Sequence, residues 1–502
     1  MQSNVLEWLE RSAQKNPEKM ALWDEKEQIT FKEYHDKSIG IAETILKASS
    51  GKKKPVVVFL EKSVKVLISF MGVAYSGNFY SPIDTDMPAA RVNKILEVLK
   101  PEIVITTKIL ADEFRTFNYK GGFLFYEDIE KKEKSEIVQK IVASIIDTDL
   151  LYVLFTSGST GVPKGVCITH GNVIDYIDWV TETFTITEND AFGNQAPFYF
   201  DNSILDIYST MKTGAALYII PQKLFSQPVM LLEYLKAHAI NTIFWVPSAL
   251  IVVSKLRALR NVDMTGVLKR VLFCGEVMPN KQLNVWRKYL PDVVYANLYG
   301  PTEITDACTY YIIDREFEDD EPLPIGWQMK NTEILVLDEK NCLVTEANVV
   351  GELCVRGTGL ARGYYRNPEK TQEVFVQNPL NDIYEEKIYR TGDLVKYNEH
   401  HELIYLSRKD FQIKHMGHRI ELGEIETAAS SLPEISLCCC LYDEKRNRIV
   451  LFIDKEVKKE EINEQLKSMI PEYMLPGKVI AKEEMPINAN GKIDRIRLKE
   501  EL

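Results

Sequence analysis

Apolar residues form short continuous runs that alternate with longer segments of helical periodicity in the N-terminal part of the chain. The runs at residues 55–60 and 242–246 lack alternating polar positions, which indicates strands buried on both faces of a sheet. Amphipathic segments at residues 63–75 and 248–258 follow them, and their length is typical of helices. Strands that alternate with helices form parallel sheets covered on both faces. The pattern therefore predicts an α/β fold.

The same criteria place the other elements of two packed α/β layers. The predicted helices cover residues 3–15, 29–46, 63–75, 88–100, 170–184, 228–238, 248–258 and 280–289, and another begins near residue 202. The predicted strands cover residues 55–60, 102–106, 150–155, 214–220, 242–246, 270–274 and 293–297.

The pattern changes in the C-terminal part. Between residues 322 and 405 the segments shorten and turn residues become frequent, which predicts an antiparallel, partly barrel-like β region. The polar stretch at residues 407–410 interrupts the pattern, and we place a hinge at residues 408–410. We therefore expect a large N-terminal domain, residues 1–407, and a small mobile α+β domain, residues 411–502.

Composition excludes several classes of protein. A chain of 502 residues is too long for one compact core, so two or more domains are expected. The net charge of −12 argues against a nucleic-acid-binding protein, which usually has a basic face. Eight cysteines without a Cys-x-x-Cys pair suggest reduced thiols and a cytoplasmic location. The N-terminus does not resemble a signal peptide, and no run of 18 apolar residues predicts a membrane span.

A loop rich in glycine and hydroxyl residues follows the apolar run at residues 150–155. Residues 156–165 read TSGSTGVPKG, so glycines allow close approach of the backbone while hydroxyls and N–H groups can donate to phosphate. Lys164 adds a positive charge. The spacing does not fit the Walker A pattern. The alternative is a plain Ser/Gly turn between two strands.

Two further stretches carry candidate nucleotide-binding residues. Residues 297–303, NLYGPTE, follow a predicted strand, and loops at strand ends bind ligands in open α/β sheets. Within them, Tyr299 offers a flat ring, Thr302 a hydroxyl and Glu303 an oxygen ligand suited to Mg²⁺. Residues 389–394, YRTGDL, place Asp393 in a second such loop. Both stretches could instead be simple turns.

Together with residues 412–426 and 490–495, these motifs resemble, in order, those of the adenylate-forming superfamily, which includes acyl-CoA synthetases, peptide-synthetase adenylation domains and luciferases. The resemblance implies that ATP and a carboxylate give an acyl-adenylate and pyrophosphate, after which a thiol captures the acyl group. It implies ATP and Mg²⁺ as cofactors. It also implies that Gly417 lets a pantetheine arm pass during thioester formation.

The resemblance assigns roles to individual residues. Lys164, Thr302 and Lys492 would be catalytic, and Glu303 would bind Mg²⁺. Asp393 would accept the ribose hydroxyls, and Arg408 would reach the nucleotide. The implied ATP-binding residues are Thr156, Ser157, Gly275, Glu276, Asn297, Leu298, Tyr299, Gly300, Pro301, Thr302, Asp393, Arg408 and Lys492.

Asp201 favours an amino acid as the carboxylate substrate. A desolvated α-ammonium needs a paired anion, and amino-acid-activating members of the superfamily have an aspartate here. The alternative is that Asp201 caps the helix that begins there. The surrounding motifs look most like the D-alanine–carrier-protein ligase branch. The implied substrate pocket is lined by Asp201, Asn202, Leu205, Phe244, Leu272, Cys274, Leu298, Asp306, Ala307 and Lys492.

Two features bear on the substrates. Asn202 and Asp306 depart from the apolar lining expected for alanine, so serine or a short diamino acid is an alternative to D-alanine. The chain ends ten residues after Lys492, so we expect the acceptor to be a separate phosphopantetheinylated carrier protein, or coenzyme A. Competing interpretations are an acyl- or aryl-CoA synthetase and a catalytically silent nucleotide-binding module.

Overall fold

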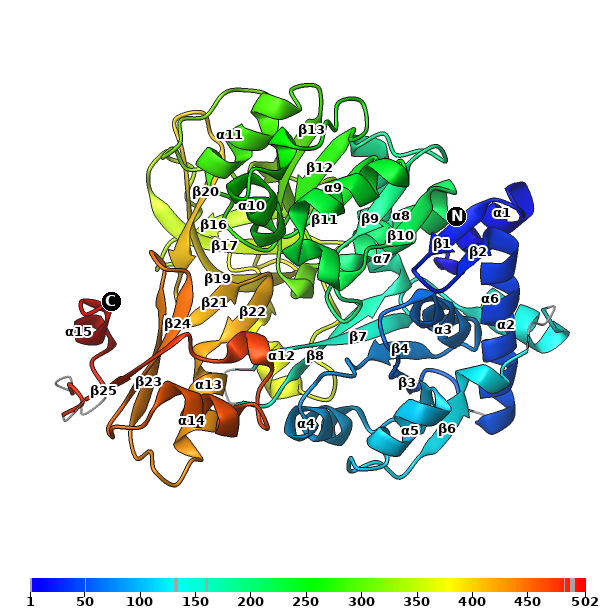
Figure 1. Cartoon of the computed structure of the whole chain (residues 1–502), viewed down its shortest axis with the longest axis horizontal. Coiled ribbons are helices and arrows are strands. Elements are labelled where there is room, and N and C mark those ends of the chain that lie inside the picture. The colour runs from blue at the N-terminus through cyan, green and yellow to red at the C-terminus, as the bar shows by residue number, and fades with distance from the viewer. Residues whose placement is uncertain (1, 50, 131–133, 159–160, 483, 488–492) are drawn as a thin grey trace.

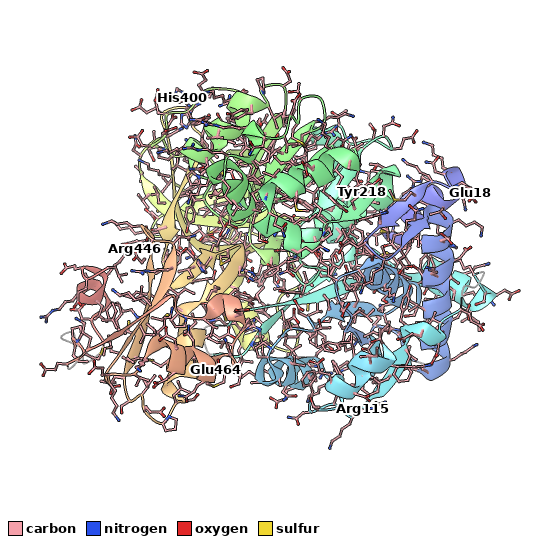
Figure 2. The ribbon with its side chains drawn as sticks, in the orientation of Figure 1. Glu18, Arg115, Tyr218, His400, Arg446 and Glu464 are labelled. Atoms are coloured by element: carbon pink, nitrogen blue, oxygen red, sulfur yellow. The ribbon has the colours of Figure 1, made fainter. Side chains whose placement is uncertain are left out.

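The computed structural model describes residues 2–49, 51–130, 134–158, 161–482, 484–487 and 493–502. Figure 1 shows two α/β layers side by side and a smaller C-terminal part next to the antiparallel strands. In Figure 2, charged side chains such as Glu18, Arg115 and Glu464 project from the outer rim, away from the centre of the molecule. No helix within the described residues is long and apolar enough to cross a membrane.

The first layer is a six-stranded sheet in which only the β7–β8 pair is antiparallel. Its strand order is β6 (Gly122–Phe125), β5 (Ile103–Thr106), β3 (Pro55–Val58), β4 (Phe79–Pro82), β7 (Leu150–Thr156) and β8 (Lys164–Thr169). Nearby helices in the chain are α2 (Phe31–Ala48), α3 (Val64–Tyr75), α4 (Ala89–Leu99), α5 (Lys108–Phe114) and α6 (Glu136–Ser144).

The second layer is a nine-stranded sheet with a parallel centre and antiparallel pairs at its edges. Its order is β15 (Trp327–Gln328), β14 (Thr309–Ile312), β13 (Val294–Tyr299), β12 (Arg270–Phe273), β11 (Thr242–Trp245), β9 (Ala191–Asn194), β10 (Ala216–Ile219), β1 (Met20–Trp23) and β2 (Gln28–Thr30). Its helices are α1 (Leu6–Lys15), α7 (His170–Thr183), α8 (Ser203–Thr213), α9 (Pro228–Ala237), α10 (Pro247–Lys255) and α11 (Asn280–Tyr289).

These two layers confirm the predicted α/β class. One expected helix starts later than its apolar pattern suggested. Residues 28–30 pair with β1, and the helix begins at Phe31 because Thr30 and Glu33 form a reciprocal capping box. Strand β1 and the edge strand β2 were not predicted, since such short strands leave little periodicity.

The antiparallel region was predicted correctly. All pairings among its strands are antiparallel, and the sheet forms a partly closed β region beside the two layers. Its elements are β16 (Thr332–Leu337), β17 (Val350–Gly357), α12 (Pro368–Val374), β18 (Phe375–Gln377), β19 (Lys387–Tyr397) and β20 (Leu403–Arg408).

The C-terminal part combines a hairpin, a three-stranded sheet and three helices around a separate apolar cluster that includes Ile425, Leu451 and Leu466. The hairpin is β21 (Gln412–His415) and β22 (His418–Glu421). The other elements are α13 (Leu422–Ser430), β23 (Cys438–Asp443), β24 (Arg448–Ile453), α14 (Lys459–Leu466), β25 (Lys478–Ala481) and α15 (Arg495–Lys499). The hinge at residues 408–410 remains a prediction, although β20 ends at Arg408.

Candidate active site

A cleft lies between the phosphate loop, the ends of the nine-stranded sheet and the β21–β22 hairpin. Its cavity volume is about 60 Å³ in this orientation of the hairpin. Residues from distant parts of the chain meet there because β7, β13 and β19 all direct a loop or strand segment toward it (Figure 1). The predicted residues in its lining are Thr156, Ser157, Asp201, Asn202, Gly275, Gly300, Pro301, Thr302, Asp393 and Arg408.

Asp393 is the centre of one hydrogen-bonded group in this cleft. Its side chain is buried and accepts a hydrogen bond from the Tyr299 hydroxyl. Arg408, its cross-strand neighbour, donates to Asp393 Oδ1 at 2.8 Å and also pairs with Asp410. Burial alone would lower the pKa of the Arg408 guanidinium, but Asp410 and Asp393 together raise it. The structure therefore brings together three residues predicted to contact the nucleoside.

The hairpin contacts the phosphate loop directly. Ser157 Oγ donates to the Arg419 carbonyl at 2.8 Å and accepts from the Glu421 N–H at 3.2 Å. Lys164, at the start of β8, lies 3.5 Å from the Glu421 carboxylate. Burial and the nearby Arg419 lower the pKa of Lys164, against the opposing charges of Glu303 and Glu421. Two groups predicted to handle phosphate are thus occupied by the hairpin; Ser159 and Thr160 lie outside the described residues.

Glu303 is fully buried on the 3₁₀ turn Thr302–Ile304. Its Oε1 accepts from the Tyr364 hydroxyl at 2.6 Å, and its Oε2 pairs with Arg419. Burial alone would raise its pKa, but Arg419, Lys164 and the Tyr364 hydrogen bond together lower it to about 2. Glu303 is therefore an ionised carboxylate at neutral pH.

An ionised carboxylate beside a phosphate loop fits a magnesium–nucleotide complex. Mg²⁺ usually takes one or two protein carboxylates and completes its coordination with phosphate oxygens and water. Within the part of the chain that the structure describes, no cluster of three or more acidic, histidine or cysteine side chains could hold a metal by itself. Glu303 thus fits a metal that binds together with ATP.

The turn of the hairpin contacts the N-terminal domain. Met416 and Gly417 both have positive φ, at 52° and 80°, as a two-residue type I′ turn requires. The Gly417 N–H donates to Glu276 Oε1 at 2.9 Å, so Glu276, predicted to bind ATP, here holds the hairpin. A Cβ atom on Gly417 would lie 2.6 Å from Val246 Cγ1. Only glycine fits this close approach without displacement of a neighbour.

A buried ion pair joins the two domains at another point. Arg91 of α4 pairs with Glu424 of α13, and both side chains are 4% exposed. Burial raises the pKa of Glu424, and Arg91 opposes that effect. Sequence patterns gave no sign of this contact, because its partners are 333 residues apart.

We predict that Arg91→Ala weakens the docking of the hairpin, since it leaves Glu424 buried without a cation. Amide hydrogen exchange of residues 412–421, measured by mass spectrometry, should accelerate at least about tenfold, which corresponds to about 1.4 kcal/mol. Arg115→Ala is the control, because its pair with Asp112 is exposed and contributes little. Unchanged exchange in Arg91→Ala would show that this ion pair does not hold the hairpin.

The predicted substrate pocket lies on one face of the nine-stranded sheet. Phe244 and Leu272 are register partners on β11 and β12, and they share an apolar cluster with Leu205, Cys274 and Leu298. Burial raises the pKa of the Cys274 thiol, which is therefore neutral at pH 7. The strands thus group the predicted lining residues, while Asp201 and Asn202 lie at the cleft itself.

The structure does not support helix capping by Asp201. The N-cap position of α8 is Asn202, and no side chain caps the helix there. The Asp201 carboxylate accepts from the Asn202 N–H at 3.1 Å. Burial raises the pKa of Asp201, an effect that a hydrogen bond with Thr302 opposes and the charge of Glu303 strengthens.

Lys492, predicted to be catalytic, lies outside the described residues. Other residues that line the cleft were missed, notably Lys414, Arg419 and Arg91. Lys414 and Arg419 are cross-strand partners on the hairpin, and the Lys414 ammonium lies 5.1 Å from the centre of the Tyr299 ring. The alternation of polar residues at 412, 414, 419 and 421 was the signal for this face, since such residues share one side of a hairpin.

Family models match both domains. The model described as AMP-binding enzyme matches residues 9–365, and that described as AMP-binding enzyme C-terminal domain matches residues 424–492. The D-alanine–D-alanyl carrier protein ligase of Staphylococcus aureus (strain MRSA252) is 32% identical over 510 residues, which cover 99% of each chain. Zwittermicin A synthase ZmaJ of Bacillus cereus is 30% identical over 509 residues, 99% of this chain and 94% of that protein.

Solved structures have the same fold. The Vibrio cholerae adenylation domain AlmE in complex with glycyl-adenosine-5′-phosphate matches with a TM-score of 0.84 and 21% identity over 100% of this chain and 98% of that one. Holo-PA1221, an NRPS protein containing adenylation and PCP domains, matches with a TM-score of 0.83 and 21% identity over 100% and 84%. The phosphate loop, the cleft and these matches agree: the chain belongs to the AMP-binding enzyme family and is an adenylate-forming ligase.

Proposed function

We propose that the enzyme activates a small amino acid, D-alanine or a small polar amino acid, as its aminoacyl-adenylate. The observation behind this proposal is Asp201, a partly buried carboxylate that lines the cleft beside Thr302. Among the described residues it forms no ion pair, so an α-ammonium from the substrate would supply the missing cation.

The same site accounts for adenylation. A carboxylate oxygen of the amino acid attacks the α-phosphorus of ATP, and pyrophosphate leaves. Lys164 and the Ser157 hydroxyl would bind phosphate oxygens once the hairpin moves away from them, and Lys492 would contact the reacting carboxylate. Mg²⁺ held at Glu303 would offset phosphate charge. Catalysis of this displacement at phosphorus would come from positioning of the reactants and from stabilisation of the phosphate charge.

The second step is transfer to the phosphopantetheine thiol of a separate carrier protein. The sulfur attacks the adenylate carbonyl, a thioester forms and AMP leaves. Support comes from the relative described as a D-alanyl carrier protein ligase, which matches over its full length, and from the neighbour that contains a PCP domain. The turn of the hairpin lies beside the cleft, where Gly417 donates to Glu276, and this orientation of the small domain would suit the transfer step.

The alternative is an acyl- or aryl-CoA synthetase. Its substrate would lack an amine and would place no cation beside Asp201, so the carboxylate would lose water without compensation. A silent nucleotide-binding module is disfavoured because Lys164, Glu303 and Asp393 all converge on the cleft region.

The decisive experiment is ATP–pyrophosphate exchange with a panel of amino acids and of carboxylic acids without an amine. We expect exchange with at least one small amino acid and none with propionate or benzoate. Thioester formation should then be greater with a phosphopantetheinylated carrier than with coenzyme A. Exchange that depends on propionate or benzoate instead would favour the CoA synthetase alternative.

A further inference from the structure

A second carboxylate, that of Asp306, belongs to a loop packed against the cleft: a Cβ on Gly300, which lines the cleft together with Asp201, would lie 2.6 Å from the Asp306 carbonyl oxygen. Asp306 is 1% exposed, and its Oδ2 accepts a hydrogen bond from the Tyr176 hydroxyl of α7 at 2.6 Å. Burial raises the pKa of Asp306 strongly, and the negative charge of Asp201 raises it further. Asp201 thus lines the cleft, and Asp306 lies beside its lining.

The other oxygen of Asp306 has no partner. Its Oδ1 is buried without a hydrogen bond, and Asn202 Nδ2, whose residue lines the cleft, is also buried and unpaired. No lysine, arginine or histidine in the described part of the chain comes within ion-pair distance of Asp306; the charge of Lys414 opposes the raised pKa only weakly. Buried carboxylate oxygens are normally satisfied, so a ligand group is expected at Oδ1.

The backbone holds Asp306 in an unfavourable conformation. Thr305 and Asp306 have consecutive positive φ angles of 64° and 74°. Each such non-glycine residue costs roughly 1–3 kcal/mol, and strain of this kind concentrates at ligand sites.

We propose that Asp306, positioned by Tyr176, binds a second ammonium group on a short side chain, so that the substrate is a small diamino acid such as 2,3-diaminopropionate. This inference rests on the proposed function, because Asp201 must bind the α-ammonium. Two carboxylates are then matched by two cations from one ligand. A serine hydroxyl could donate to Oδ1 but, unlike an ammonium, would bring no positive charge to stabilise the ionised form of Asp306. The apolar residues Phe244, Leu272 and Leu298 around the site offer no other polar contact.

The test compares two isosteric substrates in ATP–pyrophosphate exchange. The side chain of 2,3-diaminopropionate ends in an ammonium group, and that of 2-aminobutyrate ends in a methyl group at the same position. Alanine and serine complete the panel. The wild-type enzyme should prefer diaminopropionate over 2-aminobutyrate in kcat/KM by at least about 100-fold, as expected for a paired buried ion. In Asp306→Asn this preference should disappear, while exchange with 2-aminobutyrate is retained or increased.

A ratio of two substrates measured on one variant does not depend on the fraction of folded protein. Tyr176→Phe provides the second variant: it should reduce the same preference about tenfold by removing the hydrogen bond that positions Asp306. A wild-type preference for alanine, 2-aminobutyrate or serine, or an unchanged preference in Asp306→Asn, overturns the inference alone. Absence of exchange with every amino acid overturns the proposed function and this inference with it.

Discussion

Asp201→Ala is expected to lower kcat/KM for amino-acid-dependent ATP–pyrophosphate exchange by about 150- to 5,000-fold. The α-ammonium would enter the cleft and lose water without an anion, and removal of one partner from a buried pair costs about 3–5 kcal/mol. The loss should be largest in KM for the amino acid, with KM for ATP little affected, because Asp201 takes no part in the hydrogen bonds around Asp393, the group that would bind the nucleoside.

Two variants serve as comparisons for this result. Asp201→Asn keeps the shape of the side chain and should be impaired nearly as much, because charge is the proposed contribution. Asp263→Ala removes a carboxylate that accepts a hydrogen bond only within an exposed turn, and it should exchange at the wild-type rate. If Asp201→Ala uses the same amino acid at the wild-type rate, Asp201 does not bind the ammonium.

Gly417→Leu is expected to abolish transfer to the carrier while it leaves adenylation intact. The glycine has φ of 80°, and a Cβ there would lie 2.6 Å from Val246. A leucine cannot occupy this position without displacing the hairpin, so the docked orientation is lost. Transfer from a supplied aminoacyl-adenylate should fall at least about 100-fold, and pyrophosphate exchange should change less than about threefold.

Lys492→Ala should show the reverse, with loss of exchange and retention of transfer, because Lys492 is proposed to contact the carboxylate that reacts during adenylation, whereas Gly417 is proposed to act in transfer. Met416→Leu is the matched control: it lies in the same turn but is 56% exposed, and both half-reactions should proceed normally. Equal impairment of both half-reactions by Gly417→Leu and Lys492→Ala would refute an arrangement with two domain orientations.

Local sequence patterns predicted much of the fold. Buried parallel strands such as β3 and β11 have continuous apolar runs, and the helices between them have clear periodicity. The pattern did not predict β1 or the pairing of residues 28–30, because strands of three or four residues have too few positions to establish a period.

Site residues could be predicted where both partners of a contact belong to motifs that lie close together in the sequence. Asp393 and Arg408 are 15 residues apart and meet as neighbours on β19 and β20. Tyr176 and Tyr364 could not be predicted, since their contacts to Asp306 and Glu303 span 130 and 61 residues and depend on how separate elements pack. The engagement of Glu303 by Arg419 likewise depends on the orientation of the small domain.

The contacts of the hairpin with the phosphate loop have a consequence for the energetics of domain rotation. In the docked orientation Arg419 neutralises Glu303, and Glu421 lies beside Lys164. With ATP bound as proposed, Mg²⁺ and phosphate would take the same two positions with the same signs of charge. Neither end state then leaves a buried ion uncompensated, so the two orientations can be close in free energy. By linkage, magnesium pyrophosphate should compete with docking, and its departure would favour thioester formation without any further input of energy.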